Sequence, residues 1–367
     1  MAFSISLILV EKEFGMRNYR YNEKWESLLT PEIVALLSKI HEDKGKQALY
    51  IESHEDALVE LVEIAKIQST DASNRIEGIH TSDERLKKIV LDKTRPKTRD
   101  EEEIAGYRDV LQIIHDSHDY LPVKSSVILQ LHRDLFKYAG LEPGGKYKTV
   151  DNVIEEIDAT GDKRIRFVPS PAWETPTAVE QLCKSYEEIM KEDYVDPLLV
   201  IPMFILDFLC IHPFKDGNGR MSRLLTLLLL YRSGCIVGKY VSIEKIIEAT
   251  KESYYAVLEE SSYRWHESQN DYKPFVKYTL EVIASAYKGF SSRVRVLSTS
   301  GLTKPDRIQE LIKDHLGAIT KAEIMEGCPD ISQSTIQRTL IELIKEGLII
   351  KIGGGRYTSY VWNRENE

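Results

Sequence analysis

Hydrophobic residues recur every three or four positions along most of this chain, which predicts a mainly α-helical protein. Clusters of glycine, proline and serine divide the pattern into segments. We expect a helical region over residues 1–100, a helical core over 101–290, a linker rich in serine and threonine over 291–305, and a separate unit over 306–367. The clearest helical patterns cover residues 31–41, 56–69, 101–115, 123–138, 197–211 and 265–287.

Two regions depart from this helical pattern. Residues 149–157 and 165–168 form two short β-prone runs around a Gly161-Asp162-Lys163 turn, which predicts a β-hairpin. The last unit has three helical stretches, 306–316, 321–326 and 332–347, followed by strands at 348–352 and 356–362 that turn at 353–355. That order resembles a winged helix, whose third helix usually enters the DNA major groove.

Charge limits the DNA-binding interpretation. Residues 301–367 carry nine Lys or Arg against ten Asp or Glu, and the whole chain has a net charge of −9. Nucleic-acid binding normally requires a basic face, because neutralised phosphates supply most of the affinity. A local patch from Arg338, Lys345, Lys351 and Arg356 keeps DNA binding open, beside a protein-interaction or packing role.

Composition indicates an ordinary globular protein of two or three domains, with 42% hydrophobic and 29% charged residues among 367. Its four cysteines are dispersed, which predicts reduced thiols and a cytoplasmic location. Residues 3–10 lack the basic flank and cleavage site of a signal peptide. The apolar run 197–211 contains Asp207 and is shorter than the ~20 residues of a membrane span, so we expect a buried helix and no membrane contact.

The segment HPFKDGNGR, from His212 to Arg220, joins this apolar run to another at 224–231. Gly217 and Gly219 permit a turn that exposes successive N–H groups, and a helix starting near Arg220 adds its positive end, so an anion is favoured there. Arg220 and Arg223 share one helix face and suit a polyphosphate.

The same segment also holds a carboxylate and an imidazole. Asp216 provides a carboxylate of the kind that binds Mg²⁺ together with phosphate oxygens. His212 can accept a proton near neutrality and so act as a general base for a hydroxyl nucleophile.

These residues resemble the Fic (filamentation induced by cAMP) motif, HxFx(D/E)GNGRxxR, at every specified position. The resemblance implies a protein adenylyltransferase, a nucleotidyltransferase that moves AMP from ATP onto a protein hydroxyl of Ser, Thr or Tyr. By resemblance His212 is the catalytic base and Asp216 binds Mg²⁺. Gly217, Asn218 and Gly219 then form the anion hole, Arg220 contacts the phosphates and Arg223 holds the γ-phosphate, while Phe214 anchors the loop in the core.

An upstream segment, Ser73 to Gly78, resembles the inhibitory motif (S/T)xxxE(G/N) of Fic proteins that carry their inhibitor N-terminal to the core. The resemblance implies that Glu77 pairs with Arg223 and forces ATP into an unproductive pose. Charge-assisted hydrogen bonds of roughly 1.5–3 kcal/mol are strong enough for this competition. Gly78 also fits an ordinary helix C-cap, so a plain helix end stays an alternative.

Family resemblance further places a target-aligning flap at the hairpin, with Val153 over the nucleotide, and aromatic residues near the adenine at Tyr254 and Tyr255. An open flap edge would register a target segment by strand addition. The expected fold is therefore a Fic-type helical core with a β-hairpin flap, plus a C-terminal winged-helix domain. Adjacent tyrosines face different sides of a helix, so a core position for one of the two is the alternative.

Two other patterns suggest different sites. Residues 140–146 fit GxxxxGK, but Tyr147 replaces the Ser or Thr that a P-loop needs. His115 and His118 have metal-ligand spacing without a third such ligand nearby, which favours a solvated helix end.

Three functions stay open at this stage: AMP transfer held in check by Glu77, removal of AMP by the same site, and nucleotide-dependent transcription regulation through the winged helix. The complete motif favours the first, because the regulator hypothesis depends on fold resemblance alone. Self-modification and a homodimer also remain open.

Overall fold

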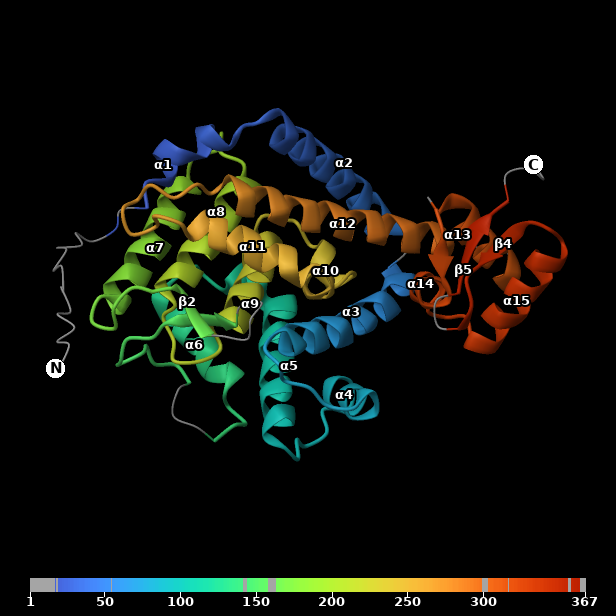
Figure 1. Ribbon diagram of the computed structural model, residues 1–367, viewed down its shortest axis with the longest axis horizontal. Coiled ribbons are helices and arrows are strands. Elements are labelled where there is room, and N and C mark those ends of the chain that lie inside the picture. The colour runs from blue at the N-terminus through green and yellow to red at the C-terminus, as the bar shows by residue number, and fades with distance from the viewer. Residues whose placement is uncertain are drawn as a thin grey trace, which may run out of the picture.

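The computed structural model describes residues 17, 19–53, 55–140, 144–157, 163–298, 303–315, 317–355 and 358–363. Over these residues the protein is mainly helical, as predicted, with one elongated helical body and a smaller unit at the C-terminal end (Figure 1). The helices of the body are α1 (Tyr21–Lys24), α2 (Pro31–Ser53), α3 (Glu55–Ile76), α4 (Asp83–Val90), α5 (Arg99–Ser117), α6 (Ser125–Leu135), α7 (Thr175–Ile189), α8 (Pro197–Ile211), α9 (Asn218–Arg232), α10 (Ile243–Ala249), α11 (Lys251–Ser262) and α12 (Lys273–Ser298), with 3₁₀ turns at Trp25–Leu28, His118–Tyr120 and Val237–Lys239.

Helix α8 forms the centre of the body, as its all-round apolar sequence requires. Nearly all of its residues are buried, and it packs against α7, α9 and α12. Asp196 caps its first turn by accepting a hydrogen bond from the Leu198 N–H, and Pro197 occupies the first helical position, where no N–H is needed. The motif segment begins where this helix ends.

Asp207, the one acidic residue of α8, is fully buried and fully hydrogen-bonded. Its carboxylate accepts hydrogen bonds from Tyr21 Oη at 2.7 Å, Trp265 Nε1 at 2.6 Å and Tyr272 Oη at 2.8 Å, and pairs with Arg17 at 3.3 Å. A buried carboxylate is tolerated only with such partners. This network ties the N-terminal segment and the turn before α12 to the central helix.

Helix α12 begins later than the sequence pattern predicted. Residues 263–272 form turns instead of continuing a helix from 265, because Arg264 and Ser268 adopt positive φ angles and Pro274 lies in the first turn of the helix that follows. Helices α2 and α3 extend further than predicted, to Ser53 and Ile76.

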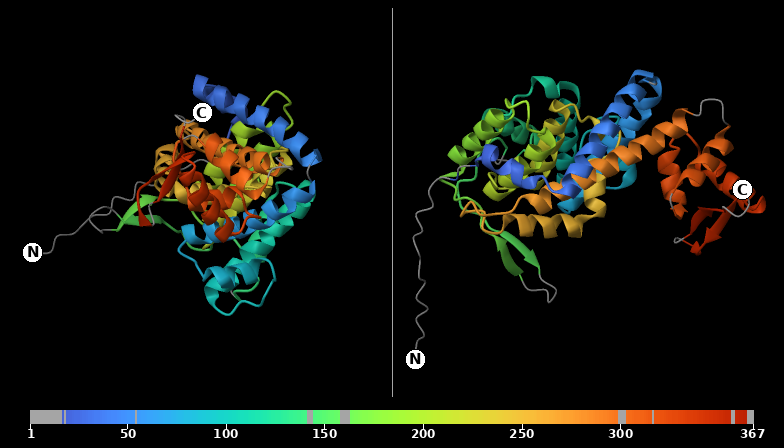
Figure 2. Two further views of the ribbon diagram at one scale, coloured as in Figure 1. Left: turned by 90° about the vertical axis from the view of Figure 1, so that its right-hand side faces the viewer. Right: turned by 90° about the horizontal axis from the view of Figure 1, so that it is seen from above.

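A two-stranded hairpin projects from the helical body (Figure 2). Strands β1 (Ile154–Ile157) and β2 (Lys163–Phe167) pair antiparallel, with Ile154 opposite Phe167 and a bulge between Ile154 and Glu155. The predicted first strand was longer because residues 149–153 are β-prone, but Asn152 and Lys148 bind the motif loop instead of a strand. The predicted turn residues Gly161 and Asp162 lie outside the described residues.

The C-terminal unit has its own hydrophobic core, which includes Ile308, Ile336 and Leu340. It consists of α13 (Lys304–Asp314), β3 (Ile319–Thr320), α14 (Lys321–Gly327), α15 (Gln333–Lys345), β4 (Ile349–Ile352) and β5 (Ser359–Trp362). Its sheet is antiparallel, with the strand order β3-β5-β4.

The predicted linker is largely helical. Residues 291–298 continue α12, and Lys304 and Pro305 already belong to α13. Val294 is buried and Arg293 donates a hydrogen bond to the Tyr240 carbonyl, so apolar periodicity and a buried contact outweigh the local serine content. Helix α12 therefore reaches from the body to the C-terminal unit (Figure 1).

Candidate active site

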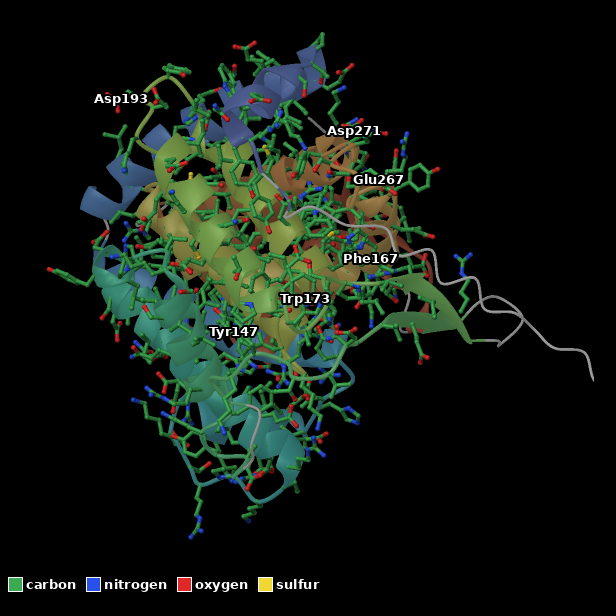
Figure 3. All side chains as sticks on the ribbon, turned by 90° about the vertical axis from the view of Figure 1, so that its left-hand side faces the viewer. Tyr147, Phe167, Trp173, Asp193, Glu267 and Asp271 are labelled. Atoms are coloured by element: carbon green, nitrogen blue, oxygen red, sulfur yellow. The ribbon has the colours of Figure 1, made fainter. Side chains whose placement is uncertain are left out.

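A pocket of about 350 Å³ lies where α3 and α8 end, α9 begins, and α11 and the hairpin approach them. It brings together six residues that the sequence analysis selected from three separate segments: Glu77, His212, Gly219, Arg223, Tyr254 and Tyr255. Its other lining residues are Ile154, Glu155, Arg166, Phe167, Leu206, Leu209, Cys210, Leu258 and Ser262. Figure 3 shows Phe167 where the hairpin joins the helical body.

His212 ends α8 in the left-handed conformation, with φ 50° and ψ 60°. Its Nδ1 lies 3.3 Å from the Leu209 carbonyl oxygen. A ring nitrogen next to a carbonyl carries the proton, which leaves Nε2 as the acceptor. Burial lowers the pKa of His212 to about 4, and the nearby charge of Lys148 adds to this effect. At neutral pH the imidazole is therefore uncharged and able to take a proton.

The motif loop is held by its own side chains and by the segment before the hairpin. Asn218 is buried and exchanges two hydrogen bonds with the Phe214 backbone, at 2.9 and 2.8 Å. Lys148 donates to the Ile211 carbonyl at 3.1 Å, and Asn152 donates to the Phe214 carbonyl at 3.2 Å. Asn218, predicted within an anion hole, thus uses its side chain to fix the loop.

His132, on α6, supports the loop from behind. Its ring stacks on Phe214 with centroids 3.6 Å apart. Its Nδ1 accepts from the Gly145 N–H, so its Nε2 carries the proton and donates to the Asp216 carbonyl, each at 3.0 Å. Burial lowers the pKa of His132 to about 4. No local sequence signal marks this residue as a support for the loop, because its loop partners Phe214 and Asp216 come from a distant segment.

At two glycine positions of the motif, a Cβ would collide with a neighbouring side chain. Gly217 has φ +80°, and a Cβ there would lie 2.9 Å from the Phe136 ring. A Cβ on Gly219 would overlap Oε1 of Glu77. Helix α9 starts at Asn218, so its unpaired N–H groups and positive end lie at this turn, as the anion-site prediction requires.

The predicted pairing of Glu77 with Arg223 is present in the structure. Arg223 is buried and donates to Glu77 Oε1 at 2.7 Å, and to the hydroxyl and carbonyl of Ser73 at 2.8 Å each. Burial would raise the pKa of Glu77, but the charge and hydrogen bond of Arg223 lower it overall. Gly78, with φ +80°, follows the end of the helix. The segment is therefore an ordinary helix C-terminus and also supplies the carboxylate that pairs with Arg223.

Arg220 and Asp216 lie apart from the residues that line the pocket. The Arg220 guanidinium is 1% exposed, pairs with Glu103 of α5 at 2.7 Å and lies over the Phe136 ring. Asp216 is half exposed, lies 3.7 Å from Arg220, and accepts a 2.6 Å hydrogen bond from the Gly217 N–H. A phosphate contact from Arg220 and a metal contact from Asp216 stay predictions.

The flap residue named from sequence differs from the one that reaches the pocket. Val153 is 46% exposed and precedes β1, whereas Ile154 lines the pocket. Tyr254 and Tyr255 both line it, and their rings meet edge to face with centroids 5.4 Å apart. Sequence reasoning also missed Arg166 and Phe167, which line the pocket from the second strand of the hairpin.

Within the described residues, no group of three or more His, Cys, Asp or Glu side chains could hold a metal ion by itself. His115 is buried against Tyr231 Oη, and its pKa is lowered to about 3 by burial, so it is a core residue. No described helix combines the length and apolar character needed to cross a bilayer.

Comparison with known proteins gives consistent results. The chain is 25% identical over 216 residues to protein adenylyltransferase fic-1 of Caenorhabditis elegans, covering 57% of this chain and 37% of that protein. It is 28% identical over 131 residues to a probable protein adenylyltransferase of Aquifex aeolicus, covering 36% of this chain and 37% of that protein. The match therefore spans little more than a third of each relative.

Solved structures show the same fold. A Fic family protein from Desulfovibrio desulfuricans G20 superposes with a TM-score of 0.59 at 22% identity, covering 92% of this chain and 97% of that one. Fic-1 from C. elegans superposes with a TM-score of 0.57 at 20% identity, covering 74% and 76%. Residues 122–230, from the start of α6 almost to the end of α9, match the model of the Fic/DOC family, so this chain contains a Fic/DOC domain.

Proposed function

We propose that this protein is a nucleotidyltransferase that moves AMP from ATP onto a hydroxyl side chain of a target protein. The observation that carries the proposal is the convergence of His212, the start of α9 and Arg223 on one pocket. The names of relatives from C. elegans and A. aeolicus support the same activity.

In the proposed reaction the target oxygen attacks the α-phosphorus of ATP. The bond from that phosphorus to the bridging oxygen breaks, and pyrophosphate leaves. His212 Nε2 takes the hydroxyl proton, because its other nitrogen faces the Leu209 carbonyl. The N–H groups at the start of α9 stabilise the negative charge that develops on the phosphate oxygens.

Magnesium fits this site through Asp216. Mg²⁺ usually takes one or two protein carboxylates, with phosphate oxygens and water completing its shell. The half-exposed Asp216 beside the glycine turn matches that requirement, although its carboxylate also accepts the Gly217 N–H. When bound, the ion would neutralise charge on the phosphates.

We propose that Glu77 inhibits this reaction. Its carboxylate takes the position on Arg223 that a γ-phosphate needs, and Ser73 orients the same guanidinium. Lys251 donates to the Ile76 carbonyl at 2.9 Å, which fixes the end of α3 beside the pocket. The hairpin, as a flap, would align a target segment along its edge.

Incorporation of radiolabelled AMP tests the proposal. We expect little label with the native chain, strong label with Glu77→Gly, and none above background with Glu77→Gly combined with His212→Ala. Each protein is incubated with labelled ATP, Mg²⁺ and a cell extract, and self-labelling is measured without extract. Absence of label with Glu77→Gly contradicts AMP transfer.

The position of Glu77 in the same pocket as His212 favours a second candidate, removal of AMP with Glu77 orienting water. A labelled target from the first assay, repurified and added to native protein, distinguishes the two directions. Loss of label that requires Glu77 supports removal. Stable label supports transfer alone.

We further propose that the C-terminal unit is a winged-helix module that contacts protein. Its order of three helices and a three-stranded sheet supports the fold assignment. Ile341 on α15 is 57% exposed and Ile344 is 37% exposed, and apolar side chains on the helix that usually enters DNA favour a protein partner. Sequence-specific binding of DNA in a gel mobility-shift assay at physiological salt would contradict this assignment.

A further inference from the structure

Arg166 brings a second positive charge to the pocket from strand β2. The side chain is partly buried and lines the pocket opposite α11. Its guanidinium carbon lies 5.3 Å from the centroid of the Tyr255 ring, within cation–π range. The Tyr255 ring therefore stabilises the guanidinium at the pocket wall.

The other arginines of the site already have carboxylate partners. Arg223 pairs with Glu77, and Arg220 pairs with Glu103 outside the pocket lining. Among the described residues no carboxylate forms an ion pair with Arg166. Arg166 is thus the pocket-lining arginine that remains available to an anionic guest.

Arg166 also acts on the reacting side of the pocket. Its charge lowers the pKa of His212, together with burial and Lys148, whereas Glu77 raises it. Arg166 similarly lowers the pKa of Tyr254, and Arg223 has the larger effect on that tyrosine. Arg166, His212, Tyr254 and Tyr255 all line the same pocket, so a nucleotide bound there would bring its phosphates within reach of the Arg166 side chain.

We propose that Arg166 is a phosphate-binding residue through which the hairpin grips the bound nucleotide. The inference builds on the proposed function and deepens it. A guanidinium offers planar paired donors to phosphate oxygens, and the stacked tyrosine limits the freedom that binding would otherwise remove. Because the side chain comes from the hairpin, phosphate binding and hairpin position become coupled.

The test compares two arginines on the same strand. Arg166→Gln and Arg164→Gln each remove one positive charge, but Arg164 is exposed, lies near Glu259 at 3.5 Å and is absent from the pocket lining. Both are made in the Glu77→Gly protein, so that Arg223 is free. Calorimetry then gives dissociation constants for ATP, GTP and inorganic tripolyphosphate, each with Mg²⁺.

We expect Arg166→Gln to weaken binding of all three probes by about tenfold or more, as for loss of a charge-assisted contact. Arg164→Gln should change each by less than twofold. Arg166→Lys should recover part of the loss, because charge is kept and the planar fork is lost. Weaker ATP binding with unchanged tripolyphosphate binding would show that Arg166 contacts the base, and would overturn the proposal, as would unchanged binding of every probe.

A kinetic measurement separates this role from a structural one. Removing the Arg166 charge should raise the pKa of His212, so the acid limb of AMP transfer moves to higher pH, while Arg164→Gln leaves it in place. The charged groups that remain near His212 in this background are Lys148 and, among the pocket-lining residues, Glu155 and Arg223. An unmoved acid limb would contradict the placement of Arg166 near the reacting atoms. Binding without transfer in the Glu77→Gly protein would refute the proposed function and leave the phosphate contact standing.

Discussion

The two ends of the pocket are built by different means. At the α9 end, Arg223, Ser73 and Asn218 are buried and joined by hydrogen bonds of 2.7–2.9 Å to fixed partners. At the hairpin end, Ile154 and Arg166 come from two short strands that project from the body (Figure 2). Val153 and Ile165, their neighbours, are 46% and 59% exposed.

Under the proposed function, this difference separates the chemical step from target recognition within one pocket. Reacting groups need fixed geometry, because a small displacement of a base or an anion site costs much of the rate. Contacts to a variable protein partner benefit from exposed strand edges. Substitutions at the buried end should therefore reduce the rate of AMP transfer strongly. Substitutions on the hairpin should have smaller effects on the kinetics.

The largest effect is expected at His212. In the Glu77→Gly protein, His212→Ala should reduce the rate of AMP transfer by about 10²–10⁴, the usual contribution of a general base. Labelled-AMP rates give the factor, and circular dichroism confirms that the variant is folded. A rate within tenfold of the parent would mean that His212 is not the base.

The pH dependence is expected to be nearly flat in the acid range. Because the pKa of His212 is lowered to about 4, its imidazole stays neutral and able to accept a proton down to about pH 5. An ordinary histidine base with pKa about 6.5 would lose roughly 30-fold between neutrality and pH 5. We expect less than a twofold fall in kcat/KM for the Glu77→Gly protein over that range. If kcat/KM instead fell with a midpoint between pH 6 and 7, the His212 imidazole would be solvated and not buried.

Two glycines with the same backbone angle allow a matched stability test. Gly217 and Gly78 both have φ +80°, but a Cβ at Gly78 meets nothing within 4 Å, whereas at Gly217 it meets the Phe136 ring. Gly78→Ala should cost about 1–2 kcal/mol, the left-handed backbone term. Gly217→Ala should cost about 1–3 kcal/mol more, from overpacking. Urea unfolding measures the loss of stability in both variants. Equal losses would indicate that the loop around Gly217 moves to accommodate the added Cβ.

The smallest effects are expected on the hairpin. Ile154→Ala should raise the KM for ATP by about three- to tenfold through lost apolar contact, and Val153→Ala by less than twofold. Steady-state kinetics in the Glu77→Gly background compares them. The reverse order would place Val153 over the nucleotide, as the family resemblance implied.

Local sequence patterns were enough to predict the helical class, the hairpin and the two helices that frame the motif. The structure confirms that Glu77 meets Arg223 and that both tyrosines reach the pocket. Charge and spacing correctly indicated a helix N-terminus at the glycine turn.

Contacts between distant segments were outside the reach of pattern analysis. His132 supports the loop across 84 positions, and Asp207 pairs with Arg17 across 190 positions and accepts a hydrogen bond from Trp265 across 58. Arg220 lies at the expected position in the sequence, but its guanidinium forms an ion pair with Glu103 of α5. The local pattern gave no sign of this partner. Serine content alone also gave no sign that residues 291–298 of the predicted linker continue α12, where Arg293 makes a buried contact.

The bare Cα of Gly219 is what leaves room for the Glu77 carboxylate. Any side chain added there would displace the carboxylate and would also crowd the Arg223 guanidinium. Under the proposed inhibition by Glu77, a substitution at Gly219 that releases the inhibitory contact would also disturb Arg223. Changes within α3 would release the contact without altering the motif, so the strength of the proposed inhibition can evolve separately from the rate of AMP transfer.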